Sequence, residues 1–318
     1  MHSDQLLPGE GQIKSLGLQV TQPRSTTSEG RFPDGGAWRV EIPSVEGPEP
    51  LRAVLEESRE RGVPVHRVSQ GSGVMMLDDA EIKDMVAVAQ DGGAELSLFL
   101  GPRGIWDIGA AVTSASGGSG PRARGRDQLG QCLEDVVRAA ELGVRNVLVA
   151  DEGVLWACHQ LREQSELPQD MRFKVSILAG PVNPASVIVV AGLGADSINV
   201  PSDLTVAQVA ELRAACPVAI DFYLESPDDA GGIVRLYDAA ELIRVSSPIY
   251  LKFGLRNAPA IYPAGGHLRA SATETARERV RRARLALDIM ERGGGASLPM
   301  SPVGDPQLPV PARFPVPA

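Results

Sequence analysis

The sequence predicts an α/β protein that folds as a single closed (β/α)8 TIM barrel, and three observations support this. A short β-rich run, a turn and an amphipathic helical run follow one another eight times along the chain. The repeated part covers about 260 of the 318 residues, the usual length of such a barrel. A doubly wound open sheet has the same local pattern, but eight units favour closure, and the first strand–helix turn lacks a GxGxxG motif.

Each repeat begins with a run rich in β-branched and other apolar residues, which is typical of a strand. The expected strands lie at 37–45, 63–71, 94–101, 144–151, 172–180, 195–201, 217–226 and 247–257. Each strand leads to a run whose apolar residues recur every three or four positions, which predicts a helix with one buried side. The expected helices lie at 48–62, 78–93, 126–143, 152–164, 183–194, 205–216, 231–246 and 274–293. Glycine ends several of them, as in "ELG", "GLG" and "ERG", a common helix C-terminal signal.

Composition divides the chain into three parts. Residues 1–35 are rich in Gly, Ser, Thr, Pro and Gln and show little periodicity, so we expect a flexible N-terminal tail. Residues 36–293 contain the repeated units and form the barrel. Residues 294–318 are Pro-rich, which predicts an extended, disordered C-terminal tail.

Charge and hydrophobicity exclude several classes of function. The chain is 43 % hydrophobic and 22 % charged, as globular proteins are, and its net charge of −9 argues against a nucleic-acid partner held through phosphates. It has no apolar run long enough to cross a membrane, and its N-terminus lacks the apolar stretch of a signal peptide. We therefore expect a cytoplasmic protein that acts on a small molecule or a peptide, without nucleic-acid or membrane partners. Assembly into a homo-oligomer is compatible with the sequence.

The cysteines point to structural thiols. Cys132, Cys158 and Cys216 lie far apart, and no CxxC pair is present. This spacing predicts buried, reduced thiols and neither a zinc ribbon nor an iron–sulfur cluster.

Alternation along the strands predicts charged side chains on the barrel axis. In "PVAIDFYLESPDD" (217–229) every second residue is apolar and should face the helices, so the residues between them face inward. Applied to all the strands, the same rule places charged residues inside, among them Glu41, Lys174, Asp221, Glu225 and Lys252. Buried charges need partners, so these residues form either a self-satisfied ion network or a charged site at the C-terminal end of the barrel. The sequence leaves both open.

Barrel enzymes place their chemistry at the C-terminal ends of the strands, which selects the candidate catalytic residues. Glu41, Asp151 and Glu225 are carboxylates at strand ends, and Asp221 lies deeper. Glu41 and Glu225 are the candidate ligands of a divalent cation, the one cofactor we expect to suit such a site. Asp151 fits equally well as the N-cap of the next helix.

Two basic side chains complete the catalytic candidates. Lys252 forms a Schiff base only if burial lowers its pKa, and nearby carboxylates oppose that. His66 is a candidate general base because imidazole titrates near pH 7, although either His66 or Arg67 points inward and alternation does not decide which.

Polar residues that follow strands are candidates for binding the substrate. Arg256, beyond the eighth strand, suits a carboxylate or a phosphate group. The candidate substrate-binding residues are Ser69, Arg103, Asn183, Asn199, Arg256 and Asn257.

The central third of the chain resembles the U32 peptidase family, the collagenase-like group. The resemblance rests on "DEGVL" (Asp151–Leu155), on Asn183 at the start of the next helix, and on "GADSINVPSDLTVAQVAEL" (Gly194–Leu212). It implies a TIM-type barrel and a hydrolase activity. Some similar proteins bind iron–sulfur clusters through a set of cysteines that this chain lacks.

Three hypotheses of function follow. The first is a U32-like hydrolase that cleaves an amide or related bond with metal- or base-activated water. The second is a lyase or isomerase that acts on a small oxyacid or sugar. The third is a non-catalytic scaffold that binds partners through its Pro-rich tail.

Overall fold

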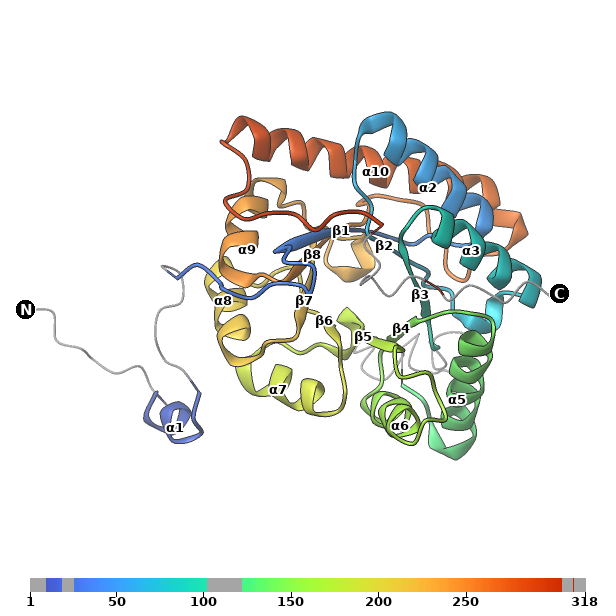
Figure 1. Cartoon of the computed structure of the whole chain (residues 1–318), viewed down its shortest axis with the longest axis horizontal. Helices are drawn as coiled ribbons and strands as arrows, with labels where there is room; N and C mark the ends of the chain where they lie inside the picture. The colour runs from blue at the N-terminus through green and yellow to red at the C-terminus, as the bar shows by residue number, and fades with distance from the viewer. Residues whose placement is uncertain (1–9, 19–25, 102–121, 305–310, 312–318) are drawn as a thin grey trace, which may run out of the picture.

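The computed structural model shows eight parallel strands that close into a barrel surrounded by helices (Figure 1). The structure describes residues 10–18, 26–101, 122–304 and 311. The strands pair in chain order, and the last pairs with the first, which closes the sheet. The predicted TIM-barrel fold is therefore confirmed.

The strands are short, and most of their residues are buried on both faces, as parallel strands inside a layer of helices must be. They are β1 (Trp38–Pro43), β2 (Arg67–Ser69), β3 (Glu95–Phe99), β4 (Asn146–Val149), β5 (Arg172–Val175), β6 (Ser197–Asn199), β7 (Ala219–Glu225) and β8 (Ile249–Phe253).

The helices begin and end at the signals that the sequence carries. Asp78, Asn183 and Thr205 each form a capping box at a helix start, and α2 ends at Gly62 in the left-handed conformation. None of the helices described here combines the length and the apolar character needed to cross a bilayer. The helices are α1 (Glu10–Ser15), α2 (Pro48–Arg61), α3 (Asp79–Asp91), α5 (Gly125–Glu141), α6 (Glu152–Glu163), α7 (Pro184–Gly192), α8 (Val206–Ala215), α9 (Ala239–Ser246) and α10 (Arg269–Arg292).

The hydrophobic core lies between the strands and the helices. Ile220, Phe222 and Leu224 of β7 are buried in this layer, as the alternation predicts. The long helix α10 packs along α2, outside β1 and β8 (Figure 1). The last helix of the barrel thus packs against its first strand and first helix. All three cysteines are buried as thiols.

Segments near both ends of the chain contact the N-terminal end of the barrel. Met300 forms a β-bridge with Trp38, and the Ser301 hydroxyl donates to Asp34 over 2.9 Å. At Gly36 a Cβ atom would lie 2.2 Å from Ser301 Oγ, so only glycine allows this close approach. Residues from both segments that composition assigns to tails, 1–35 and 294–318, thus pack near β1. They do so through the β-bridge and the hydrogen bond described above.

His66 belongs to this contact rather than to the C-terminal end. Its Nδ1 accepts a hydrogen bond from the Val40 amide over 3.0 Å, and its Nε2 lies 2.8 Å from the Ser301 carbonyl oxygen. Burial lowers the pKa of His66 to about 4, so the ring is neutral at pH 7. The structure therefore places His66 among packing contacts at the N-terminal end of the barrel, away from the C-terminal ends of the strands.

Replacing His66 with glutamine should remove part of the pH dependence of stability. Between the unfolded pKa of about 6.5 and the folded pKa of about 4, the unfolded chain binds more protons, so stability falls as the pH falls. From pH 7 to pH 5 the free energy of unfolding should drop by about 2 kcal/mol more in the wild type than in the variant. Urea unfolding at both pH values measures this, and equal drops in the two proteins would contradict it.

Candidate active site

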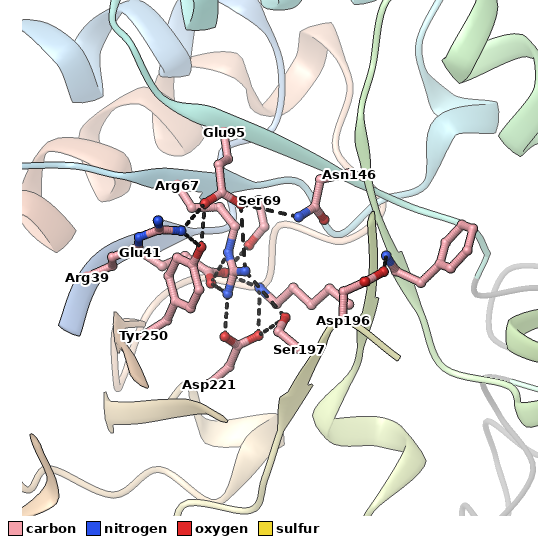
Figure 2. A network of polar contacts seen from close by, with 12 residues as sticks. Arg39, Glu41, Arg67, Ser69, Glu95, Asn146, Asp196, Ser197, Asp221 and Tyr250 are labelled. Carbon is pink, nitrogen blue, oxygen red and sulfur yellow. Dashed lines mark hydrogen bonds and ion pairs between the residues drawn. The ribbon is translucent and has the colours of Figure 1, made fainter. Parts of the chain in front are cut away.

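The register of the strands brings charged side chains together on the barrel axis. Glu41 of β1 lies opposite Arg67 of β2 and Lys252 of β8, and Arg67 in turn lies opposite Glu95 of β3. Residues in register on neighbouring strands share a face of the sheet. Figure 2 shows Glu41, Glu95, Ser197, Asp221 and Tyr250, which come from different strands, gathered around Arg67.

Glu41 is the centre of the positive charges. Its Oε1 accepts hydrogen bonds from Lys174 and, over 2.7 Å, from the Ser69 hydroxyl, and it lies 3.6 Å from Lys252 Nζ. Its Oε2 accepts from Arg67 Nε over 2.7 Å. The Glu41 carboxylate thus contacts three cations while its side chain is fully buried.

Asp221 is the second carboxylate that contacts these cations. Arg67 Nη2 lies 2.5 Å from Asp221 Oδ1 and 2.5 Å from Glu41 Oε2, so one guanidinium bridges both carboxylates. Asp221 Oδ2 accepts from the Ser197 hydroxyl over 3.1 Å and lies 3.8 Å from Lys174 Nζ. We name Glu41, Arg67, Lys174, Asp221 and Lys252 the central cluster.

The central cluster shifts the pKa values of its members in opposite directions. Burial alone would raise the pKa of Glu41, but Arg67, Lys174 and Lys252 outweigh it and hold that pKa well below its usual value. Burial, together with Arg67 and Lys252, lowers the pKa of Lys174 to about 7 against the opposing effect of Glu41. Burial also lowers the pKa of Lys252. The carboxylate is held ionised, whereas Lys174 can lose its proton near neutral pH.

A second polar layer lies below the central cluster, toward the N-terminal end. Glu95 accepts hydrogen bonds from Tyr250, from Arg39 Nη1 over 3.2 Å and from Asn146 Nδ2 over 3.3 Å. The Arg67 guanidinium stacks 3.5 Å from the centroid of the Tyr250 ring. Glu41, Lys174, Asp221 and Lys252 thus pair with one another and with Arg67, an arrangement that fits the ion-network alternative.

The cavity that opens to the C-terminal ends of the strands lies above this network. We call it the mouth cavity; it has a volume of about 440 Å³. Tyr223 forms part of its wall, and the Tyr223 ring covers Lys252 Nζ at 4.0 Å, which separates the cavity from the central cluster. The polar residues that line it are Ser44, Ser176, Tyr223, Asp228, Asp229, Tyr262 and Arg279.

Arg279 is the buried cation of the mouth cavity. It comes from α10, and only 3 % of it is exposed. Within the described residues, Arg279 Nη1 donates to Thr275 Oγ1 over 3.2 Å, whereas Nε has no hydrogen-bond partner and no carboxylate lies within ion-pair distance. Burial lowers the pKa of Arg279 against the opposing effect of Tyr262 and Glu46, yet arginine keeps its proton.

The other polar groups of the mouth cavity suit proton transfer. Burial, together with Asp228, raises the pKa of Asp229, which brings that carboxylate closer to a useful basicity. Burial also raises the pKa of Tyr223 and of Tyr262, so both phenols keep their protons. The Tyr262 hydroxyl donates to the hydroxyl of Ser44, a residue with φ 60°, in the strained left-handed region.

Glu225 lies elsewhere, because the strand is irregular there. A register shift between Tyr223 and Glu225 sets Glu225 opposite Phe253, whose side chain belongs to the core outside the barrel. Glu225 Oε1 accepts from the Arg256 amide over 3.0 Å, and Oε2 lies 3.7 Å from Arg282 of α10. Glu41 and Glu225 thus have different partners, and the structure does not bring them together as a metal site.

Electrostatics also disfavour a cation beside Glu41, since three cations already neutralise it. Among the residues that the structure describes, no group of three or more His, Cys, Asp or Glu side chains could hold a metal ion.

Two further candidates act as helix caps. Asp151 accepts a hydrogen bond from the Val154 amide over 3.0 Å at the start of α6. Asn183 accepts from the Ser186 amide over 3.0 Å at the start of α7 and is exposed. Both local roles follow from their position before a helix.

The remaining candidate binding residues separate into buried and peripheral ones. Ser69 and Asn199 lie inside the barrel. When the Asn199 side-chain amide is oriented so that its nitrogen and its oxygen both have partners, the oxygen accepts a hydrogen bond from Lys252 Nζ over 2.8 Å. Arg256 is exposed, and its Nε lies 3.6 Å from Asp228 Oδ1. The backbone amide of Asn257 donates to Asp228 Oδ2 over 2.5 Å. Arg103 lies outside the described residues.

Sequence reasoning missed Arg279 and did not decide whether Arg67 faces inward. Arg67 begins a strand of three residues, too short for alternation to choose between it and His66. Arg279 lies on a helix whose buried side otherwise consists mainly of Ala, Val, Leu and Met. A charged residue inside that apolar stripe is the signal that would have identified it.

Comparison with known proteins finds only distant similarities. No protein-family model and no curated protein matches the sequence. A solved U32 peptidase is 19 % identical, with a TM-score of 0.42, over 71 % of this chain and 95 % of that one. A putative lyase/mutase from Burkholderia cenocepacia J2315 is 15 % identical, with a TM-score of 0.44, over 82 % and 85 % of the two chains. A putative fructose-1,6-biphosphate aldolase from Coccidioides immitis is 11 % identical, with a TM-score of 0.49, over 81 % and 91 %. These similarities concern the barrel and assign no activity to this chain.

Proposed function

We propose that this protein is a barrel enzyme that binds a small oxyacid in the mouth cavity and catalyses a lyase- or isomerase-type reaction. The observation that carries the proposal is Arg279, a buried guanidinium that lines the cavity with an unsatisfied Nε atom. An uncompensated buried charge costs several kcal/mol. A carboxylate or similar anion in the cavity would remove that cost.

The walls of the cavity describe the rest of the substrate. A volume of about 440 Å³ suits a small molecule rather than a protein chain. Several apolar side chains line the walls, so the part of the substrate away from its anionic group should be apolar or short. The apolar lining residues are Phe99, Leu148, Ile177, Leu178, Pro227, Ala230, Leu255, Ala258, Pro259, Ala260 and Ile261.

The polar groups around the cavity can move a proton beside the bound carboxylate. Asp229, whose pKa is raised, would accept a proton from the carbon next to that group. The electron pair left behind would pass into the carboxylate, where Arg279 stabilises the added negative charge. The Tyr223 or Tyr262 hydroxyl would then return a proton to the same carbon from the opposite face, giving the epimer. Alternatively, it would protonate a group that leaves from the neighbouring carbon while the electron pair forms a carbon–carbon double bond, giving a lyase product.

Amide hydrolysis is the second hypothesis. Glu41 and Glu225, the carboxylates first expected to activate water, have other partners and do not line the cavity. Of the groups that do line it, Asp229 would have to serve as the base for water.

Replacing Arg279 with leucine should weaken binding of carboxylates by about 10- to 100-fold, the usual effect of losing a hydrogen bond to a charged group. The ligand-free variant should be as stable as the wild type or more stable, because the buried charge is gone. A thermal-shift screen of small hydroxy, oxo and phosphorylated acids, each beside its neutral amide or alcohol, followed by calorimetric titration of the hits, measures both effects.

Arg282→Gln is the matched control, since Arg282 lies on the same helix but pairs with Glu278 and Glu225 outside the cavity. It should leave the affinity unchanged. The proposal fails if neutral analogues bind as tightly as the acids, or if Arg279→Leu retains the affinity of the wild type.

A further inference from the structure

A second cavity lies at the opposite, N-terminal end of the barrel, with a volume of about 290 Å³. It opens at the first residues of the strands, where barrel enzymes usually carry only stabilising contacts. Five polar residues that line it begin β2 to β6: Arg67, Glu95, Asn146, Arg172 and Ser197. The second polar layer forms its inner wall (Figure 2).

Asn146 leaves an unused acceptor in this wall. Its Nδ2 donates to Glu95 over 3.3 Å, which fixes the orientation of the amide. Its Oδ1 has no partner among the described residues, although only 3 % of Asn146 is exposed. A buried acceptor without a donor lowers the stability of the fold, because it has lost its hydrogen bonds to water, so a ligand that donates here would be favoured.

Positive charge lies nearer the opening. The Arg172 side chain is 46 % exposed and lies 3.6 Å from Asp196, so its guanidinium is only loosely paired. Arg31 lines the same cavity. Apolar side chains form the remaining walls, including Phe32, Pro217 and Pro248.

We propose that this N-terminal cavity is a binding site for a small carboxylate that carries a hydrogen-bond donor on the adjacent carbon. The donor, an ammonium or a hydroxyl group, would reach Asn146 Oδ1, and the carboxylate would meet Arg172. Both α-amino acids and α-hydroxy acids have this chemistry. The site is independent of the mouth cavity, because Asn146 and Arg172 do not line that cavity.

Calorimetric titration with four probes tests the chemistry: L-alanine, L-lactate, acetate and ethylamine. L-Alanine and L-lactate differ only in the donor, so the tighter of the two identifies the source as an amino acid or a hydroxy acid. At least one of them should bind about tenfold more tightly than both acetate and ethylamine, since each simple probe makes only half of the contacts.

Variants locate the site. Asn146→Leu should weaken the better ligand at least about tenfold while leaving the ligand-free melting temperature equal or higher, because the unused acceptor is removed. Arg172→Gln should also weaken binding of the better ligand. Because the Arg172 side chain is half exposed, this variant should fold, and it tests the site if Asn146→Leu does not fold. Arg282→Gln, a change at a residue that lines neither cavity, should bind the ligand as the wild type does. The inference is overturned if no probe binds, or if both N-terminal variants keep the wild-type affinity.

Discussion

Replacing Arg67 with methionine should lower the free energy of unfolding by about 3–5 kcal/mol, the usual cost of removing one partner from a buried ion pair. Arg67 bridges Glu41 and Asp221, each over 2.5 Å, and 1 % of its side chain is exposed. Without Arg67, the two carboxylates keep the lysines as their cationic partners among the described residues. The Tyr250 ring also loses the guanidinium stacked on it. Against a typical total of 5–15 kcal/mol, such a loss is close to unfolding the protein.

Urea unfolding of the wild type and of Arg67→Met measures this effect. Arg172→Met is the matched control: Arg172 begins a strand at the same end of the barrel but is half exposed and loosely paired, so its loss should cost less than about 1 kcal/mol. Arg67→Lys should restore little stability, since an ammonium lacks the fork that reaches both carboxylates. An Arg67→Met protein as stable as the control would show that the central cluster does not hold the barrel together.

Replacing Glu41 with glutamine is the second large change, and its cost should depend on pH. The variant leaves Arg67, Lys174 and Lys252 with Asp221 and with the longer, 3.9 Å ion pair between Arg67 and Glu95, so about 3 kcal/mol or more should be lost near pH 5.5. Arg67 cannot lose its proton, but Lys174 can, since its pKa is already lowered to about 7. Removing Glu41 removes a charge that raises this pKa, so the pKa should fall further.

The sign of the pH effect follows from proton linkage. Between the lowered pKa of folded Lys174 and its unfolded pKa of about 10.4, the unfolded chain binds more protons, so stability rises with pH. In Glu41→Gln this rise should begin at a lower pH than in the wild type, and the difference between the two proteins should therefore be smaller at pH 8 than at pH 5.5. Urea unfolding at both values tests this.

Glu278→Gln provides the control for this experiment. Glu278 pairs with Arg281 and Arg282 on the partly exposed side of α10, so its loss should cost less than about 1 kcal/mol and should not change with pH. If Glu41→Gln lowers the free energy of unfolding by less than about 1 kcal/mol, or by the same amount at both pH values, then Glu41 does not stabilise the charged form of Lys174.

The barrel itself was predictable because its signals are local. Eight strands followed by helices show in the spacing of apolar residues, and the inward direction of Glu41, Lys174, Asp221 and Lys252 shows in the period of two along each strand. The helix-cap alternative for Asp151 has the same origin, because a cap depends on residues a few positions away.

The partners of those side chains were not predictable, because they come from strands far apart in the chain. Arg67 and Asp221 are separated by 154 positions, and only the register of a closed barrel places them in contact. The register shift in β7 turned Glu225 toward α10, and alternation carries no sign of such a shift. The sequence by itself determined which faces of the strands would be charged. The tertiary structure decided that these charges pair with one another and that the unsatisfied cation of the mouth cavity, Arg279, comes from a helix, because pairing depends on closure and on packing between elements.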